Sequence, residues 1–201
     1  MQHGGNAEST KPCVASFIYI CVSDDMEEAY TGDPVERKRD MSDKRQDYIS
    51  WDEYFMGVAY MSAMRSKDPN TQVGACIVSK DNKILSMGYN GFPLGISDDE
   101  FPWRREGEEL ERKYVYTVHS ELNAILNYRG GSLEGAKMYV TLFPCNECAK
   151  AIIQAGIRKV IYDEDKYADT VAVLASKRML SKAGVVFHPY GRTGRKIELT
   201  L

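Results

Sequence analysis

The hydrophobic positions change their period several times along the chain, and each change marks an expected element. A first group recurs at helical spacing: Trp51, Phe55, Val58 and Ser62, flanked by Tyr54 and Met61. This pattern predicts a helix whose Met and Tyr side chains pack in the core. Ser50 and Glu53 form the capping-box pattern S-W-D-E at its start. The turn-forming residues Asp-Pro-Asn at 68–70 are expected to end it.

Beyond this helix, short apolar runs alternate with further helical patterns. The expected strands are VGACIVS (73–79), ILSMGYN (84–90), KMYVTLF (137–143), RKVIYD (158–163) and VVFH (185–188). The expected helices are HSELNAILNY (119–128), NECAKAIIQAG (146–156, ended by Gly156) and about 169–183, ended by Gly184. The first two strands form a hairpin through the turn K-D-N-K. The alternation after them predicts an α/β fold with helices covering a central sheet.

The N-terminal part of the chain differs in composition from the rest. VASFIYICV (14–22) is apolar, whereas residues 24–46 are nearly all polar or charged, as in a solvated linker. The apolar run could belong to a signal peptide. However, it has little positive charge before it and no small-residue cleavage pattern after it. We therefore expect residues 1–45 to be a largely disordered N-terminal extension of a cytoplasmic protein.

Composition narrows the class of protein without identifying it. The 201 residues fit one domain with its own core, and no stretch approaches the roughly 20 apolar residues of a membrane-spanning helix. The formal net charge of −3 argues against a nonspecific nucleic-acid-binding protein. Five cysteines are an odd and sparse set, so the chain is not a disulfide scaffold.

Cys145 and Cys148 stand two positions apart in the sequence FPCNEC. Such a pair can form a disulfide, bind a metal ion or act as a thioredoxin-like redox couple. A redox pair normally lies near the first strand, whereas this pair comes late in the chain. A structural zinc would need two further soft ligands. The following cysteines and histidines offer no partner at a useful spacing: Cys13, Cys21, Cys76, His3 and His188.

His119 is the remaining candidate, at the start of an expected helix. His119, Cys145 and Cys148 with a fourth position open make a catalytic zinc arrangement rather than a structural one. Both ligand sets lie where the chain enters a helix, so two positive helix ends would favour thiolate over thiol. Glu121 is adjacent without being needed as a ligand, so it can carry protons. With Pro144, these residues match H-x-E…P-C-x-x-C, the signature of zinc nucleobase deaminases.

From Asp47 to His188 the chain resembles the deoxycytidylate (dCMP) deaminases of the cytidine deaminase superfamily. The resemblance is carried by SKDPNTQVGACIV, GYNGFP, HSELNAI, LFPCNECAKAIIQAGI and DKY at 165–167. Free-nucleoside cytidine deaminases share the metal motif but not GYNGFP and DKY. The resemblance implies a three-layer α/β/α fold with a central mixed five-stranded sheet. It also makes residues 46–201 a zinc-dependent deaminase domain.

The chemistry implied by the resemblance is hydrolysis of dCMP to dUMP and ammonia, which supplies dUMP for thymidylate synthesis. One Zn²⁺ per chain would activate the water that attacks C4 of cytosine, while Glu121 protonates N3 and helps the amine leave. The Pro144 carbonyl would accept a hydrogen bond from the exocyclic amine. The main-chain N–H of Ser120 would donate to the base carbonyl. Many dCMP deaminases have Ala at the position of Ser120, and this N–H survives the change.

The remaining implied roles concern the sugar, the phosphate and regulation. Asn90 would bind the deoxyribose. Tyr167 and the loop from Ser66 to Gln72, which contains Lys67, would border the phosphate. The loop that also contains Gly88, Tyr89 and Gly91 would lie near an allosteric nucleotide site. There dCTP with Mg²⁺ would activate and dTTP would inhibit a homo-oligomer, often a hexamer, which has no membrane or nucleic-acid partner.

Several alternatives stay open at this point. Another zinc deaminase would act on a free cytidine nucleoside or on adenosine in tRNA, and the net charge of −3 speaks against a tRNA substrate. A binding protein that kept the fold but lost activity would lack Glu121 or a ligand, and all are present. A redox C-x-x-C protein would show thiol–disulfide activity in place of zinc.

Overall fold

A computed structural model describes residues 44–200 of the chain. The expectations for residues 1–43, including the apolar run at 14–22, lie outside this range. The chain divides into two units between Lys44 and Arg45. The described helices and strands all belong to the unit that begins at Arg45. None of the described helices is both long and apolar enough to span a membrane.

Four α-helices and five strands build this unit. The helices are α1 (Trp51–Ala63), α2 (Ser120–Asn127), α3 (Asn146–Gln154) and α4 (Val171–Lys182), with two 3-10 turns, η1 (Glu109–Glu111) and η2 (Lys113–Val115). The strands are β1 (Gly74–Val78), β2 (Ile84–Tyr89), β3 (Lys137–Leu142), β4 (Lys159–Glu164) and β5 (Val186–Pro189). Every expected helix and strand is present. Gly156 and Gly184, with φ of 80° and 72°, follow the ends of α3 and α4 as expected.

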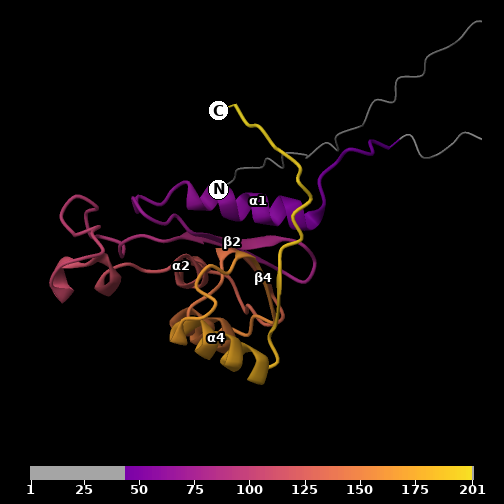
Figure 1. The fold of residues 1–201 in the computed structure, drawn as a ribbon. Coiled ribbons are helices and arrows are strands. Elements are labelled where there is room, and N and C mark those ends of the chain that lie inside the picture. Colours follow the sequence, from indigo (N-terminus) through magenta and orange to yellow (C-terminus); the bar gives the residue numbers. More distant parts are fainter. Residues whose placement is uncertain (1–43, 201) are drawn as a thin grey trace, which may run out of the picture. The chain divides into compact units, whose positions relative to one another are not determined.

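The strands form one mixed sheet in the order β2-β1-β3-β4-β5. β1 is antiparallel to both β2 and β3, whereas β3, β4 and β5 run parallel. Two hydrophobic clusters cover the two faces. One joins α1 to the sheet, and the other joins α2, α3 and α4 to the opposite face. Figure 1 shows α1 on one side of β2 and α2 and α4 on the other. The expected three-layer α/β/α fold with a five-stranded mixed sheet is confirmed.

Helix α1 confirms its predicted start but buries a different face from the predicted one. The Ser50 hydroxyl accepts from Glu53 N, and the Glu53 carboxylate accepts from Ser50 N, so the capping box is formed. Trp51 is 58% exposed, and most Met and Tyr side chains of the helix are exposed too. The buried face consists of Glu53, Phe55, Met56, Ala59 and Ala63.

A close backbone contact explains why small residues face the sheet. A Cβ on Gly74 would lie 1.9 Å from the Ala59 carbonyl oxygen, so α1 rests directly on the start of β1. A large side chain at this contact would push α1 away from the sheet. Most of the large side chains of α1 therefore lie on its exposed face. The helix also ends earlier than expected, at Ala63. Asp68 therefore does not end the helix; its side chain organises the loop that follows.

Residues 190–196 follow β5 without regular structure and pass over the start of α1 (Figure 1). This C-terminal strap is held by polar contacts at both ends. Arg192 pairs with Asp163 on β4, with nitrogen–oxygen distances of 2.6 and 2.7 Å. Thr193 Oγ1 donates to Glu53 Oε1 at 2.6 Å, and Arg195 lies 3.2 Å from the same oxygen. Glu53 thus joins the helix cap to the strap.

The Glu53 contacts predict how stability responds to acid. Hydrogen bonds from Thr193 and then from the Ser50 main chain lower the pKa of Glu53 from 4.5 to about 2. A carboxyl group with a depressed pKa stabilises the fold above its ordinary pKa, and this stabilisation is lost as the pH falls to about 2. Between pH 4.5 and about 2, the free energy of unfolding measured in urea should therefore fall less for Glu53→Gln than for the unchanged chain. Glu134→Gln, at an exposed pair with Arg158, is the control; equal acid slopes in all three proteins would contradict the prediction.

Candidate active site

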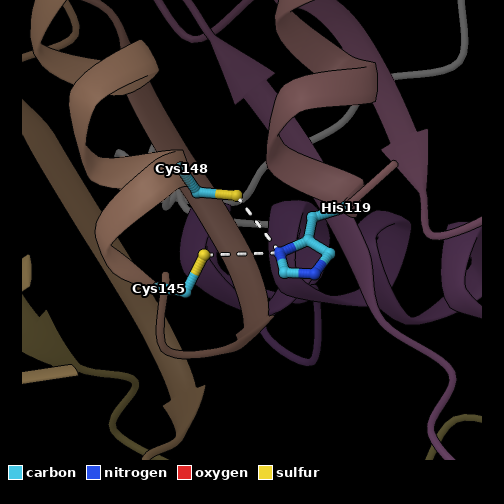
Figure 2. A group of neighbouring side chains, drawn as sticks. All are labelled: His119, Cys145 and Cys148. Carbon is cyan, nitrogen blue, oxygen red and sulfur yellow. Dashed lines mark hydrogen bonds between the residues drawn. The ribbon is translucent and has the colours of Figure 1, made fainter. Parts of the chain in front are cut away.

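Three side chains from two helix starts meet at one point. His119 immediately precedes α2, Cys145 immediately precedes α3, and Cys148 lies in the first turn of α3. His119 Nδ1 lies 3.4 Å from Cys145 Sγ and 3.5 Å from Cys148 Sγ. Figure 2 shows the imidazole with Nδ1 turned toward both sulfur atoms. Among the described residues these are the ones that could hold a metal ion together.

The distances between these atoms fit zinc. Zinc binds thiolate at about 2.3 Å and imidazole at about 2.0–2.1 Å, and tetrahedral geometry then separates sulfur and nitrogen ligands by about 3.5 Å. The measured separations of 3.4 and 3.5 Å match this spacing. Two sulfur atoms and one nitrogen are a preferred donor set for zinc and leave a fourth position for water or substrate. The three residues predicted as ligands are therefore brought together as expected.

The helix starts contribute electrostatically because neither ligand residue caps its helix. His119 and Cys145 occupy the N-cap positions of α2 and α3 with extended backbone, yet neither side chain forms a capping hydrogen bond. The first N–H groups of both helices therefore lack intrahelical acceptors and carry positive partial charge toward the cluster. This field favours the thiolate form that a metal ion needs.

The three side chains also shift one another's pKa. A hydrogen bond from the Cys148 thiol lowers the pKa of Cys145 to about 4, and the same contact raises the pKa of Cys148. The hydrogen bond with Cys145 raises the pKa of His119 to about 9, and burial of the imidazole opposes that rise. A cation bound by all three atoms instead favours two thiolates and a neutral imidazole, so metal affinity falls at low pH.

Glu121 lies in the first turn of α2, where it is 4% exposed. Its Oε2 accepts a hydrogen bond from Ser120 Oγ at 2.9 Å. Burial raises the pKa of Glu121, while the positive charge of His119 lowers it. Glu121 is next to the ligand cluster but not a member of it. A buried carboxyl group in this position can hold and release a proton beside the metal.

Pro144 is buried directly before Cys145, at the end of β3. The preceding residue, Phe143, donates its N–H to the Glu164 carbonyl at 2.7 Å, which continues the pairing of β3 with β4. The sheet therefore fixes where the chain turns from β3 into α3. Pro144, Ser120 and Glu121 all lie within two residues of a ligand, as the sequence pattern required.

Comparisons with known proteins agree with this geometry. Residues 49–164 match the family model described as the cytidine and deoxycytidylate deaminase zinc-binding region. The chain belongs to this deaminase family. The human deoxycytidylate deaminase is 57% identical over 148 residues, which cover 73% of this chain and 83% of the human protein. A probable deoxycytidylate deaminase of Drosophila melanogaster is 57% identical over 152 residues, covering 73% of this chain and 75% of its own length.

Solved structures give the same result for the fold. The dCMP deaminase of cyanophage S-TIM5, in complex with dCMP and dUMP, has a TM-score of 0.56 and 28% identity. The match covers 68% of this chain and 94% of the phage chain. The fold expected from the resemblance is thereby confirmed by both topology and structural likeness.

The GYNG loop of this deaminase packs against the helix that carries His119. A Cβ on Gly88 would lie 2.3 Å from the Ser120 carbonyl oxygen and 2.4 Å from Ala124 N. Gly88 and Gly91 both have ordinary negative φ, so the glycines are not needed for unusual backbone angles. Close approach of α2 is the reason for this glycine.

The other residues of the loop have separate contacts. Tyr89 is 38% exposed, and its carbonyl accepts from Asn123 Nδ2 at 2.7 Å. Gly91 forms a β-bridge with Val118, the residue before His119. Asn90 is buried, and its Nδ2 donates to Thr71 O at 2.9 Å. These contacts hold the loop against both sides of the metal ligand.

The residues predicted at the phosphate end lie in different surroundings. Ser66 Oγ donates to the Asn90 carbonyl at 2.8 Å, so its hydroxyl serves the loop. Lys67 is exposed and paired with Asp98, and this contact raises its pKa. Tyr167 is 38% exposed, and Lys166 Nζ lies 5.1 Å from the centre of its ring. The structure thus gives these three residues no common polar contact.

Sequence reasoning missed four residues around this region. Arg105 donates from Nε to Tyr114 Oη at 2.9 Å, and it also contacts Tyr167. Lys166 stands beside the same tyrosine, and neither cation forms an ion pair with a described carboxylate. Lys113 and Asp68 form a buried ion pair. Asp68 and Lys166 lie inside the quoted motifs SKDPNTQVGACIV and DKY, but none of the four residues belongs to a periodic pattern that would predict its contacts.

Loss of one thiolate should remove the metal and the activity together. Cys145→Ser leaves two good ligands and a weaker hydroxyl, so the variant should retain far less than one zinc per chain and have no measurable turnover. Metal content measured after dialysis checks this. Cys76→Ala is the control because Cys76 is buried on β1, away from the cluster. Stoichiometric zinc in Cys145→Ser would refute the ligand assignment.

The contact at Gly88 predicts a sharp difference between two Gly→Ala changes. Gly88→Ala forces α2 away from β2, so it should lower the free energy of unfolding by about 1–3 kcal/mol. It should also lower zinc content, because His119 moves with the helix. Gly57→Ala on α1 is the matched control, since nothing lies within 4 Å of the added carbon. That change should stabilise the protein by about 0.5–1 kcal/mol. Urea unfolding and metal analysis of both variants test the prediction.

Proposed function

We propose that this chain catalyses the zinc-dependent hydrolytic deamination of dCMP to dUMP and ammonia. The carrying observation is the His119–Cys145–Cys148 cluster with the buried carboxyl group of Glu121 beside it. A three-ligand site with an adjacent carboxylate is the arrangement of the zinc nucleobase deaminases. Among these substrates, the 57% identity with the human deoxycytidylate deaminase favours dCMP.

The metal ion would provide the water that attacks the cytosine ring. A zinc ion held by His119, Cys145 and Cys148 supplies a bound water whose pKa lies near neutrality. The chain then has to move protons, because addition of water to a cytosine ring requires a proton on N3 and later a proton on the departing amine. Glu121 is the buried carboxyl group placed for both transfers.

Two main-chain groups complete the proposed contacts with the base. The first N–H groups of α2 have no intrahelical acceptor, so the Ser120 N–H is free to donate to the base carbonyl. The Pro144 carbonyl lies one residue before Cys145, where it can accept from the exocyclic amine. These two contacts would set the ring so that C4 faces the metal and N3 faces Glu121.

Asn90 is the proposed contact with the deoxyribose. Both protons on Asn90 Nδ2 have acceptors, and Oδ1 accepts from Val73 N at 2.8 Å. One acceptor site on Oδ1 therefore remains, which suits a sugar hydroxyl donor. Tyr167, Ser66 and Lys67 would border the phosphate. Arg105 and Lys166, both beside Tyr167, add positive charge at the same end.

The proton-shuttle role makes a direct prediction for Glu121. Glu121→Gln keeps the shape of the side chain but cannot carry a proton, so kcat should fall by about 10²–10⁴-fold or more. Zinc should stay bound because Glu121 is not one of the three ligands. Glu147→Gln is the control, since Glu147 lies between the cysteines but is exposed and paired with Lys150. Near-normal kcat in zinc-loaded Glu121→Gln would refute the assignment.

A substrate panel tests the proposed function itself. Ammonia release from dCMP, CMP, deoxycytidine and dCTP should be measured with zinc-replete enzyme, together with an adenosine-containing tRNA anticodon stem. We expect dCMP to give the highest kcat/KM. A higher value for deoxycytidine or for the RNA would transfer the proposal to one of the alternative deaminases. Thiol–disulfide exchange without ammonia release would instead favour a redox protein.

We also propose that the enzyme supplies dUMP for thymidylate synthesis in the cytoplasm and acts as a homo-oligomer, specifically a hexamer. In this proposal dCTP with Mg²⁺ activates and dTTP inhibits, through a nucleotide site near Gly88, Tyr89, Asn90 and Gly91. The supporting contact is the packing of this loop on α2, because a shift at Gly88 or Gly91 would reach Ser120 or Val118, which stand on either side of His119.

Saturation curves with dCMP test this regulation. We expect dCTP to make a sigmoidal curve more hyperbolic and dTTP to make it more sigmoidal. Because coupling is reciprocal, dCMP should tighten dCTP binding by the same factor by which dCTP tightens dCMP binding. Unchanged curves with dCTP, or purely competitive inhibition by dTTP in a monomer, would refute regulation and leave the catalytic proposal intact.

A further inference from the structure

Lys113 and Asp68 form an unusual ion pair beside the active site. Of the ion pairs between residues 44 and 200, it is the one in which both side chains are buried, at 6% and 2% exposure. Lys113 lies six residues before His119, in the turn η2, and Asp68 lies in the loop between α1 and β1. Taking two charges out of water is costly, and uncharged residues of similar volume often give equal stability. Stability alone therefore does not account for the pair.

Asp68 organises its own loop as well as binding Lys113. Its Oδ1 accepts from Asn70 N at 2.8 Å and from Thr71 N at 3.3 Å, and its Oδ2 accepts from Lys113 Nζ. The Gln72 side chain donates to the Asp68 carbonyl. The loop from 68 to 72 is thus folded around one carboxylate.

Lys113 organises the chain that leads to His119. Its N–H donates to the Arg104 carbonyl at 3.0 Å. Its own carbonyl accepts from Tyr116 N at 3.0 Å, from Thr117 N at 2.9 Å and from Thr117 Oγ1 at 2.9 Å. The next residue, Val118, pairs with Gly91 through two main-chain hydrogen bonds of 2.8 and 3.1 Å. The approach to His119 is therefore fastened at Lys113 and again at Val118.

Asn90 connects these two segments to the GYNG loop. Its Nδ2 lies 3.3 Å from Asp68 Oδ2, the oxygen that also binds Lys113. The same amide donates to Thr71 O at 2.9 Å, and its Oδ1 accepts from Val73 N at 2.8 Å. Three segments distant in sequence therefore meet at one carboxylate oxygen.

The far side of the Asp68 loop faces open space. A hollow of about 200 Å³ is bordered by Asn70, Thr71, Gln72 and Val73 from this loop and by Lys166 from the segment after β4. The loop folded around Asp68 thus borders a hollow that also reaches Lys166, next to Tyr167.

We propose that the Asp68–Lys113 pair is a positioning element that fixes the 68–72 loop and Asn90 against the chain entering His119, and so sets substrate affinity. The inference rests on the proposed function, because its readout is the KM for dCMP. Neither side chain forms a hydrogen bond or ion pair with His119, Cys145 or Cys148, so the double variant is expected to keep its zinc. The pair acts through Asn90 and the loop main chain.

The test separates positioning from stability by comparing single and double variants. Asp68→Asn leaves the Lys113 ammonium buried without its partner and should lower the unfolding midpoint. The double variant Asp68→Asn with Lys113→Met removes both charges at similar volume and should recover much of that stability. Positioning predicts that the double variant still has a KM for dCMP raised by about tenfold to a hundredfold, with one zinc per chain. The single variant Lys113→Arg keeps the positive charge, so its KM for dCMP should lie between those of the unchanged enzyme and the double variant.

Hydrogen exchange supplies a second readout that needs no substrate. In the double variant, amide protection should fall at Tyr116, Thr117 and Val118, and stay unchanged in β3 and β4. Glu53→Gln is the control, since it breaks a partly buried ion pair with Arg195 far from this network. It should lower stability without changing KM or exchange at these three amides.

The outcomes distinguish the two proposals. A double variant with recovered stability and a KM within about threefold of the unchanged enzyme would overturn the positioning role, as would loss of zinc in proportion to the loss of affinity. An unchanged enzyme that does not deaminate dCMP would overturn the proposed function, and this inference would fall with it. Raised KM, retained zinc and faster exchange at the three amides, partly reversed by Lys113→Arg, would establish the positioning role.

Discussion

The contact between β2 and α2 at Gly88 is the constraint on which the site depends. Because Gly88 has no side chain, the first turn of α2 lies directly on β2. This contact fixes the distance between the sheet and His119, the residue that precedes α2. Cys145 and Cys148 lie at the start of α3, where the chain leaves β3. Because β1 lies between β2 and β3, the spacing of the sheet sets how far apart the two helix starts stand. Three ligand atoms within metal-binding distance follow from that spacing.

Much of the fold and the metal centre could be predicted because both depend on local signals. The strands are short apolar runs bounded by turns, and Ser50 with Glu53 marks the start of α1. His119, Cys145 and Cys148 needed only their positions at two helix starts. The buried face of α1 could not be predicted in the same way. Hydrophobicity favoured Trp51 and the neighbouring tyrosines, whereas the backbone contact between Ala59 and Gly74 decides which side of the helix meets the sheet.

The loops around the site carry little predictive signal for a different reason. Lys113, Asp68 and Arg105 are charged residues in segments without periodicity, where solvent exposure is the ordinary expectation. Lys113 and Asp68 are buried only because they neutralise each other across 45 residues of sequence. Lys67, one residue before Asp68, is exposed and paired with Asp98 instead. Such pairing is a property of the tertiary structure, so no pattern along the chain distinguishes the buried lysine from the exposed one.

The two helices of the site also differ from the others in how they begin. Ser50 and Thr170 cap α1 and α4 with side-chain oxygens, and caps of this kind are worth about 1 kcal/mol each. α2 and α3 have His119 and Cys145 in the cap position, and neither side chain forms a capping hydrogen bond. A serine or aspartate there would satisfy the free N–H groups and cancel the positive field that favours a thiolate. The site therefore requires two incompletely capped helices, and a metal ion that joins His119 to Cys145 and Cys148 links the same two helix starts that the sequence leaves uncapped.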